Sequence, residues 1–303
     1  MYFSLGKNPK PIILKMFRVI KNFLPVPNND PNLFFRYVSY IDIFGIFDRD
    51  PFGNWLILKR LVIFLAGVPT YWRIAVANQL KVEGTEYLAK LPNQNVYFIS
   101  NHQTYFADVI TFYHIFCSVK MGFGNRILPF GLLAPRGRIF YVAASETMKE
   151  GIIPKLFSLA GAILVERSWR AKGSNVKREL DTSAGDNVSK GLNYGWVVSF
   201  PQGTTSPYAP IRKGTAHIIK DNNPIVVPVV IDGFRRAFNK SGLNYKKRNT
   251  KLTVKFKEPI HFSPDATIEE ITEVIKNIIE QNMPERIARW KNDAEQNEKS
   301  SFY

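Results

Sequence analysis

The sequence predicts an α/β fold with a central mixed sheet flanked by helices, preceded by a hydrophobic helical region at the N-terminus. After residue 78, short apolar runs of strand length alternate with stretches of helical spacing, which is the pattern of an α/β domain. The residues before it are rich in aromatic and basic side chains. With 303 residues, of which 45% are hydrophobic, the chain can bury a sizeable core, and this excludes the disordered and fibrous classes.

Two hydrophobic segments separated by prolines begin the N-terminal region. Residues 11–24 place apolar side chains at near-helical spacing with Lys and Arg between them, which predicts a basic amphipathic helix. Pro25, Pro27 and Pro31 interrupt helix formation after it, and residues 33–47 are dense in Phe, Tyr and Ile. The basic and aromatic side chains favour contact with a membrane, and packing on the following domain is the alternative.

Residues 55–68 form the strongest candidate for a membrane span. Lys59 and Arg60 divide this apolar run and Pro69 ends it, so it falls short of the roughly 20 apolar residues that a spanning helix needs. We expect an interfacial or shallowly embedded helix, with a true span as the alternative.

Apolar runs predict the strands of the sheet, and the segments between them predict helices. The last run alternates Lys with apolar residues, as a half-exposed edge strand does. Isoleucines at helical spacing then predict a surface helix at 267–279, with Ser263 or Asp265 as its cap. The strands are expected at 96–100, 162–165, 196–200, 225–231 and 251–256, and the helices between them include 153–160 and 176–192.

The domain boundaries are expected where these patterns change. Residues 1–78 are the basic, aromatic-rich helical region that associates with a membrane. Residues 79–262 are the α/β domain, and residues 263–303 are a C-terminal surface helix with a polar tail.

The charge balance predicts an anionic partner surface. Lys and Arg number 41 against 25 Asp and Glu, a formal charge of +16, and acidic lipid headgroups and nucleic acid are the two candidates. Abundant Phe and Tyr beside basic residues favour an anionic membrane surface, and the chain lacks a recognised nucleic-acid-binding motif, so we expect no nucleic acid partner.

The start of the sequence lacks a secretory signal, so we expect the protein at the cytoplasmic face of a membrane. The single cysteine, Cys117, cannot close an intrachain disulfide, which fits a reducing compartment, and we expect it to be a buried structural thiol.

A histidine and an aspartate lie close together directly after the first predicted strand. His102 is therefore expected at a strand end, where an α/β sheet opens its cleft. A histidine paired with a carboxylate such as Asp108 can take a proton from a hydroxyl, because the carboxylate fixes the tautomer and stabilises the imidazolium. A structural pair is the alternative. Asn101 is expected to position the turn by capping the following helix, and backbone amides after His102 are candidates to stabilise an oxyanion.

Three further segments follow the histidine in a fixed order: residues 161–167, 200–206 and 226–229. Together with residues 100–108, they resemble the four sequence blocks of the glycerolipid acyltransferase superfamily, which includes the lysophosphatidate-type (1-acylglycerol-3-phosphate) enzymes. The resemblance covers about residues 80–260, and the combination is specific although each block alone is weak.

The resemblance implies roles for residues of each block. His102 would be the base for the acceptor hydroxyl, and Asp108 would orient it. Arg167 would help to hold the acceptor, and the turn with Gly203 and Thr204 would line the acceptor site. Pro228 would belong to the acyl-donor side.

The chain departs from the family pattern at three points. Five residues, not four, separate His102 from Asp108, so a bulge or a non-helical first turn must restore their contact. Gln202 replaces a glutamate, and Thr205 replaces an arginine able to bind phosphate in a bidentate way. Arg212 and Lys213 are candidates to supply replacement cations, and a solvated loop is the alternative.

The resemblance implies transfer of a fatty acyl group from acyl-CoA or acyl carrier protein to a lysophospholipid hydroxyl in phospholipid biosynthesis. A lyso-aminolipid or other hydroxylated lipid as acceptor, and a non-catalytic lipid-binding homologue, remain alternatives. The scattered histidines, the absence of a Cys pair and the absence of nucleotide-binding glycine motifs predict neither a metal nor a cofactor.

Overall fold

The computed structural model of the protein describes residues 48–128, 138–149, 152–166, 170–171, 174–175 and 182–282. The chain divides into compact units of residues 1–40 and 41–303, and all described residues belong to the second. The segments expected at 11–24 and 33–47 lie outside the described residues. So do Arg167 and the tail after residue 282.

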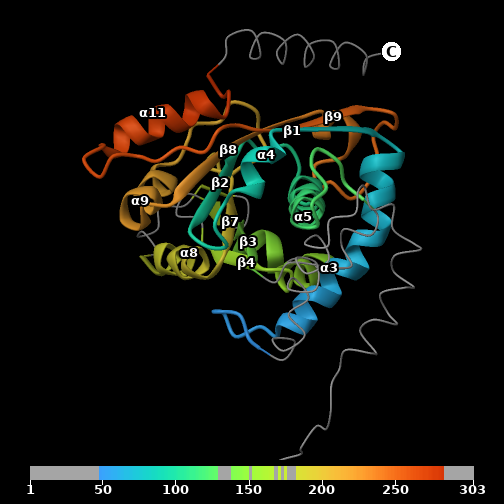
Figure 1. Ribbon diagram of the computed structural model, residues 1–303, viewed down its shortest axis with the longest axis horizontal. Coiled ribbons are helices and arrows are strands. Elements are labelled where there is room, and N and C mark those ends of the chain that lie inside the picture. The colour runs from blue at the N-terminus through green and yellow to red at the C-terminus, as the bar shows by residue number, and fades with distance from the viewer. Residues whose placement is uncertain are drawn as a thin grey trace, which may run out of the picture. The chain divides into compact units, whose positions relative to one another are not determined.

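A seven-stranded mixed sheet forms the centre of the second unit (Figure 1). Its strands are parallel to their neighbours except for β8 and β9, which are antiparallel. The order across the sheet is β1 (Gln79–Glu83), β9 (Lys251–Phe256), β8 (Ile225–Asp232), β2 (Val96–Ser100), β7 (Trp196–Ser199), β3 (Ile139–Ala144) and β4 (Ala162–Val165). A separate antiparallel pair joins β5 (Arg170–Ala171) to β6 (Ser174–Asn175). The α/β class and the mixed sheet are therefore confirmed.

The structure corrects the expected position of the strand at residues 251–256. This strand, β9, lies between β1 and β8 and is not an edge. Its alternating pattern has another cause: Leu252, Val254 and Phe256 enter the core, while Lys251 and Lys255 are exposed on the opposite face. The alternation therefore shows that the part of the opposite face around Lys251 and Lys255 is open to solvent.

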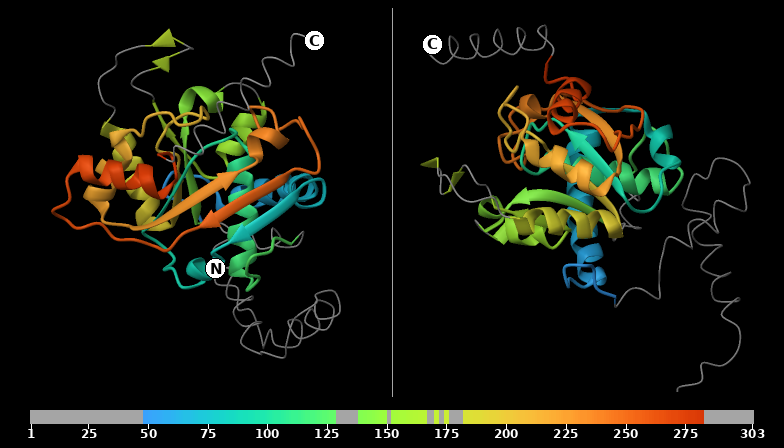
Figure 2. Two further views of the ribbon diagram at one scale, coloured as in Figure 1. Left: turned by 90° about the horizontal axis from the view of Figure 1, so that it is seen from above. Right: turned by 90° about the vertical axis from the view of Figure 1, so that its left-hand side faces the viewer.

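Helices cover both faces of the sheet (Figures 1 and 2). The side chains of β2 divide between two core clusters, with Val96 and Phe98 in one and Tyr97 and Ile99 in the other. The first cluster includes residues of α3 and α5, and the second includes residues of α8, α9 and α11. The helices are α3 (Leu56–Tyr71), α4 (Thr85–Ala89), α5 (Ala107–Lys120), α6 (Ser145–Lys149), α7 (Ile152–Ser158), α8 (Thr182–Tyr194), α9 (Lys213–Asn222), α10 (Phe234–Ala237) and α11 (Ile268–Ile278).

Helix α5 is buried along almost its whole length, from Ala107 to Val119. Its few polar side chains, which include Asp108, Thr111, His114 and Ser118, are buried as well, so the helix has no solvent-exposed polar face. Cys117 lies inside it, fully buried, as expected of a structural thiol.

Helix α3 continues past Pro69, contrary to the expectation that this proline ends it. The helix runs to Tyr71 and passes into a short π-helix at Trp72–Val76. The hydroxyl of Thr70 donates to the carbonyl oxygens of Ala66 and Gly67, which ties the turn around the proline. Among the described residues, no helix is long and apolar enough to cross a bilayer.

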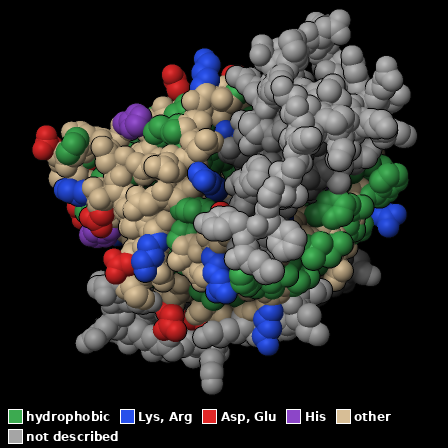
Figure 3. Space-filling model, turned by 60° about the horizontal axis from the view of Figure 1, so that its bottom comes forward, with side chains coloured by type: hydrophobic (Ala, Val, Ile, Leu, Met, Phe, Trp, Pro, Cys, Tyr) green, Lys and Arg blue, Asp and Glu red, His purple; other side chains and the backbone are tan. Residues whose placement is uncertain are grey.

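One face of α3 packs on the domain, and the other exposes a band of large apolar side chains (Figure 3). Lys59 lies on the packed face, fully buried, with its Nζ atom 3.7 Å from the centroid of the Phe140 ring. Lys59 divides the apolar run in the sequence, but its side chain belongs to the packed face and leaves the exposed band uninterrupted. The exposed band continues from α3 into the π-helix and consists of Ile57, Leu58, Leu61, Leu65 and Val68 of α3 with Trp72 and Val76 of the π-helix.

The C-terminal helix α11 is confirmed, with a different cap from the two expected. Thr267 accepts a hydrogen bond from the Glu270 backbone N–H, and the Glu270 carboxylate accepts one from Thr267 N, which makes a capping box. Ile271 and Ile275 are buried in the same core cluster as α9.

Candidate active site

The candidate site lies where three neighbouring strands end. Strand β2 pairs in parallel with β7 on one side and β8 on the other, so their carboxyl ends meet at one edge of the sheet. His102 follows β2, Phe200 follows β7, and Asp232 ends β8.

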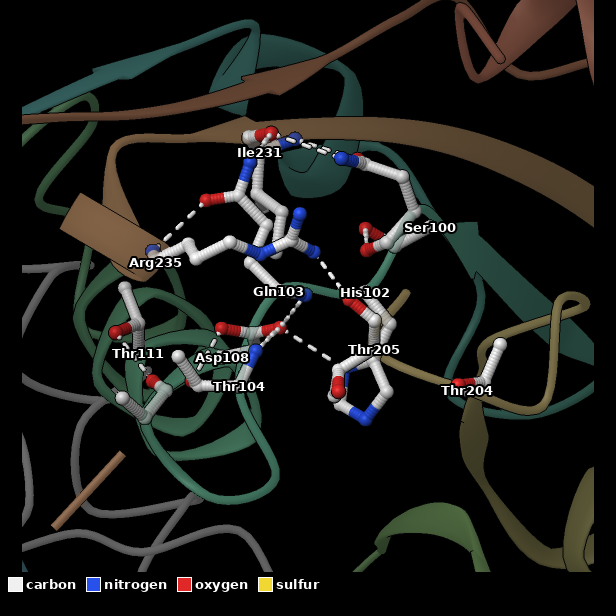
Figure 4. Close-up of polar contacts among 12 residues, drawn as sticks. Ser100, His102, Gln103, Thr104, Asp108, Thr111, Thr204, Thr205, Ile231 and Arg235 are labelled. Carbon is white, nitrogen blue, oxygen red and sulfur yellow. Dashed lines mark hydrogen bonds and ion pairs between the residues drawn. The ribbon is translucent and has the colours of Figure 1, made fainter. Parts of the chain in front are cut away.

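His102 and Asp108 form the predicted pair (Figure 4). The His102 Nδ1 atom lies 2.9 Å from Asp108 Oδ2. The Asp108 carboxylate is fully buried and also accepts hydrogen bonds from the Gln103 N–H at 2.6 Å, the Thr104 N–H at 3.0 Å and the Thr104 hydroxyl at 2.7 Å. These donors satisfy a charge that would otherwise be costly to bury. The two amides are thereby engaged with Asp108, so the expectation that amides directly after His102 face an oxyanion is wrong for Gln103 and Thr104.

The extra residue between His102 and Asp108 is accommodated in the loop that precedes α5. Helix α5 starts at Ala107, so the intervening residues form a loop and the rotation of an ideal helix does not apply. The N–H groups of Tyr105 and Phe106 donate to the carbonyl oxygens of Lys240 and Ser241, at 3.0 Å each. The non-helical first turn that the spacing demanded is therefore present.

The His102 ring is held between Asp108 and an aromatic neighbour. It stacks on Phe200 with 3.9 Å between ring centroids and 20° between planes, and 12% of its side chain is exposed. Because Asp108 is acceptor-only when ionised, His102 Nδ1 carries the hydrogen of this contact, and Nε2 is left with a lone pair. Nε2 is the atom available to take a proton from a bound hydroxyl.

Asn101 stabilises the site differently from the expected helix cap. Its amide donates to the Ile231 carbonyl oxygen at 2.9 Å, and its Oδ1 accepts from the Ile231 N–H at 2.8 Å. The side chain thus extends the pairing of β2 and β8 by one residue beyond Ser100. The following helix begins too far along the chain for Asn101 to cap it, and Phe106 occupies the N-cap position.

The structure adds Gln103 and Arg235, which the sequence analysis did not select. Gln103 Nε2 lies 3.2 Å from the Ile231 carbonyl oxygen, and Gln103 Oε1 accepts from the Arg235 N–H at 3.2 Å. The Arg235 Nη2 atom donates to the Thr205 carbonyl oxygen (Figure 4). Burial lowers the pKa of the Arg235 guanidinium, and the nearby Asp108 carboxylate opposes this shift. The signal in the sequence that could have indicated Arg235 is the basic pair Arg235 and Arg236, which follows the fourth sequence block at the end of a predicted strand.

The residues of the third block have separate surroundings. Gln202 is buried, and its amide donates to the Ala209 carbonyl oxygen at 3.1 Å and to Gln281 Oε1 at 2.8 Å. Gly203 has φ +63°, which the turn requires. Thr204 lies at the exposed side of the turn and contacts Ser206, while Thr205 is buried.

The remaining predicted site residues are not joined to the dyad by a described contact. Lys213 Nζ pairs with Glu269 of α11 at 2.6 Å, and Arg212 is exposed at the start of α9. Pro228 lies opposite Ile99 inside the sheet, where it is buried. Arg167 lies outside the described residues. The structure therefore offers Arg235, instead of Lys213, as the cation next to Asp108.

An apolar pocket lies between α3, α5 and α7. Its lining includes Val62 and Ala66 of α3, Ile110 of α5, Phe106 directly before α5, and Phe157 of α7. Phe106 is two residues from Asp108, so the pocket lies close to the dyad along the chain.

Comparisons with known proteins find similar acyltransferases. The 1-acyl-sn-glycerol-3-phosphate acyltransferases of Limnanthes douglasii and Cocos nucifera are 25% and 24% identical to this chain, over 73% and 69% of its length. The aligned parts cover 65% and 59% of those relatives, so the chain spans less than two thirds of their length. The crystal structure of the 1-acyl-sn-glycerophosphate acyltransferase PlsC from Thermotoga maritima matches with a TM-score of 0.46 and 18% identity, over 85% of this chain and 96% of that one.

A family model described as Acyltransferase matches residues 79–232. This segment contains the dyad, the third block and strand β8, and it makes up more than half of the chain. The chain therefore belongs to the acyltransferase family.

Proposed function

We propose that this chain transfers a fatty acyl group from the thioester of acyl-CoA or acyl carrier protein to the hydroxyl of a lysophospholipid such as 1-acyl-glycerol-3-phosphate. The observation that carries the proposal is the 2.9 Å contact between His102 Nδ1 and Asp108 Oδ2 at the carboxyl end of β2. Membership of the acyltransferase family and the names of the relatives support this reaction class, which would serve phospholipid biosynthesis.

The proposed transfer is direct. His102 Nε2 takes the proton of the acceptor hydroxyl while the hydroxyl oxygen attacks the thioester carbonyl carbon. The carbon–sulfur bond then breaks, and the thiolate that leaves takes the proton from the imidazolium. Asp108 stabilises the imidazolium between these two steps. The fully buried Cys117 supports a route without an acyl-enzyme intermediate.

The apolar pocket between α3, α5 and α7 is the proposed site of the acyl chain. Its described lining is almost entirely hydrocarbon and aromatic, which suits a fatty chain. Phe106 belongs to the pocket and directly precedes α5, whose first turn carries Asp108. A chain bound there would have its carbonyl end toward the dyad.

Association with an anionic membrane surface is also part of the proposal. The exposed apolar band of α3 and the formal charge of +16 support it, because apolar side chains enter the interface while cations attract acidic headgroups. Flotation with anionic and neutral vesicles tests this, with a DNA and RNA shift assay as the comparison. Binding to nucleic acid without binding to vesicles would overturn it.

A lyso-aminolipid acceptor is the second candidate, favoured by Thr205 at the position where the family pattern has an arginine. A non-catalytic lipid binder is disfavoured, because the extra residue between His102 and Asp108 leaves their contact intact.

The test is acyl transfer by purified protein in micelles, with labelled acyl-CoA or acyl carrier protein and a panel of lysolipids. Products are identified by mass spectrometry. His102→Ala and Asp108→Asn should lower kcat by roughly 1,000-fold or more, as expected when the base or its orienting partner is lost. His261→Ala, a change at an exposed histidine, is the matched control and should keep wild-type turnover. Product formation by His102→Ala at the wild-type rate would exclude the mechanism.

A further inference from the structure

Arg235 brings a positive charge close to the His102–Asp108 dyad. Among the described residues, no carboxylate forms an ion pair with this charge. Its guanidinium makes one described hydrogen bond, from Nη2 to the Thr205 carbonyl oxygen. Asp108, Tyr208 and Asp232 act on it electrostatically, but neither carboxylate forms an ion pair with it in the described part of the chain. An arginine has five N–H donors, so most of this fork is available to a ligand.

The neighbouring Arg236 is an ordinary surface arginine and serves as a comparison for Arg235. Arg236 is exposed and pairs with Asp232, with 3.1 Å between Nη2 and Oδ2. Arg235 belongs to the same short helix, α10, but is half-buried and points back over the site (Figure 4). Two adjacent arginines thus have different environments, and only the inner one faces the dyad.

Contacts from two other strand ends hold Arg235 in place. The backbone N–H of Arg235 donates to Gln103, which is adjacent to His102, and the guanidinium reaches the loop after β7 at Thr205. A side chain fixed at both ends loses little rotamer freedom when a ligand binds, which strengthens binding. The position of the charge is therefore set by the same strand ends that set the dyad.

The guanidinium also lies where the sequence lacks a cation. Thr205 stands where the family pattern has an arginine, and the Arg235 guanidinium contacts the backbone of that same residue. The charge absent from the loop after β7 is thus supplied from the end of β8. A planar guanidinium binds phosphate or carboxylate oxygens through paired N–H donors.

We propose that Arg235 binds the anionic headgroup of the acceptor lipid, a phosphomonoester or a carboxylate, and thereby selects acidic over neutral acceptors. The inference rests on the proposed function. It assigns acceptor specificity to a residue after the fourth sequence block and leaves proton transfer to His102.

The experiment compares three acceptors: lysophosphatidate, a lyso-aminolipid with a free carboxylate, and the uncharged monoacylglycerol. It uses the full chain, with Arg235→Gln, Arg235→Lys and the matched surface control Arg236→Gln. Arg235→Gln should lower kcat/KM for the preferred anionic acceptor by roughly 100-fold, mainly by raising KM. For monoacylglycerol, kcat/KM of this variant should stay within about threefold of the wild-type value. Arg235→Lys should recover part of the loss, and Arg236→Gln should behave as wild type.

The comparison of kcat/KM among the three acceptors distinguishes the possible roles of Arg235. The two anionic arms tell whether the headgroup is a phosphomonoester or a carboxylate. Equal losses by Arg235→Gln on anionic and neutral acceptors would mean that Arg235 only supports the loop, and would overturn the inference. A wild-type preference for monoacylglycerol would overturn it even if Arg235→Gln failed to fold. A wild-type protein inactive with all acceptors and both donors would instead refute the proposed function.

Discussion

Gly242 lies so close to Ala107 that a Cβ atom added to it would come within 2.6 Å of the Ala107 nitrogen and 3.0 Å of Thr104 Oγ1. The glycine has φ +81° and belongs to the loop whose carbonyl oxygens hold the N–H groups of Tyr105 and Phe106. Thr104 in turn donates to Asp108. The loop at residues 240–242 is therefore what allows five residues to separate His102 from Asp108 without loss of their contact.

The first prediction is that Gly242→Ala impairs acyl transfer. The new methyl group would push Thr104 and Ala107 away and shift Asp108 relative to the His102 ring, so kcat should fall by about tenfold or more. The matched control is Gly53→Ala, because Gly53 has φ +82° and no atom within 4 Å of an added Cβ. Both variants should lose roughly 1 kcal/mol of stability from backbone strain, and Gly242→Ala should lose about 1–3 kcal/mol more from its close contacts. Equal turnover by the two variants would show that the close packing of Gly242 is immaterial to the dyad.

The second prediction is that Lys59→Met stabilises the fold at pH 7. Lys59 is fully buried, its Nζ has no hydrogen-bond partner among the described residues, and burial lowers the pKa of Lys59 to about 7 although Asp50 opposes the shift. Replacing a buried charge by an apolar side chain of similar volume should add about 1–4 kcal/mol to the free energy of unfolding. Urea denaturation measures this.

The pH dependence gives a second readout for Lys59. The folded-state pKa of Lys59, about 7, lies below the ordinary lysine pKa of 10.5, so between these pH values unfolding takes up a proton. The Lys59 contribution to the free energy of unfolding should therefore rise with pH, by at most about 1.4 kcal/mol per unit, and Lys59→Met should lack this rise. Lys81→Met, on an exposed side chain, should change stability by under about 0.5 kcal/mol. A Lys59→Met protein less stable than wild type at pH 7 would contradict the prediction.

The third prediction concerns His114, which is buried beside the apolar pocket. Its Nε2 atom lies 3.0 Å from Thr70 Oγ1, whose hydrogen goes to a backbone carbonyl, so His114 donates through Nε2. Burial lowers the pKa of His114 to about 4. Between pH 4 and the ordinary value of 6.5, unfolding takes up a proton, and stability should fall as the pH falls through this window.

The test for His114 compares two substitutions. His114→Gln should remove a slope of up to about 1.4 kcal/mol per pH unit between pH 4 and 6.5 from the free energy of unfolding. Thr70→Val keeps the imidazole and should keep the slope, while costing about 1–3 kcal/mol because the His114 N–H loses its partner. Identical slopes in wild type and His114→Gln would mean that His114 takes no part.

The strands that the sequence failed to predict have weak or ambiguous patterns. β1 is an edge strand in which Val82 is the buried residue, so little periodicity marks it. β3 is an apolar run buried in the sheet interior, and such a run fits a buried helix segment equally well. The strands at 96–100 and 225–231 were predictable because apolar runs of this length are bounded by polar turns.

At the site, local contacts were predictable and distant ones were not. Only a short loop separates His102 from Asp108 in the first turn of α5, so their pairing could be predicted from the sequence. The contacts of Asn101 with Ile231 and of Arg235 with Gln103 span about 130 residues and depend on β8 lying beside β2. Strand order is not contained in hydrophobic periodicity, and this is why Arg235 was missed and Lys213 was chosen instead.

The fourth prediction is that filling the apolar pocket changes the acyl chain that the protein accepts. Ala66 lines the pocket from α3, and Ala66→Phe would place a ring in the space proposed for the end of the chain. The preferred donor should become shorter, with kcat/KM for a long-chain acyl-CoA falling by about tenfold or more, since an overfilled pocket costs about 1–3 kcal/mol. The neighbouring Leu65 belongs to the exposed band, so Leu65→Phe is a matched control that leaves the pocket unchanged. Mass spectrometry of products from a mixture of acyl-CoA chain lengths gives the preference directly. An unaltered chain-length profile in a folded Ala66→Phe protein would place the acyl chain elsewhere, and the pocket would then have to be explained by packing alone.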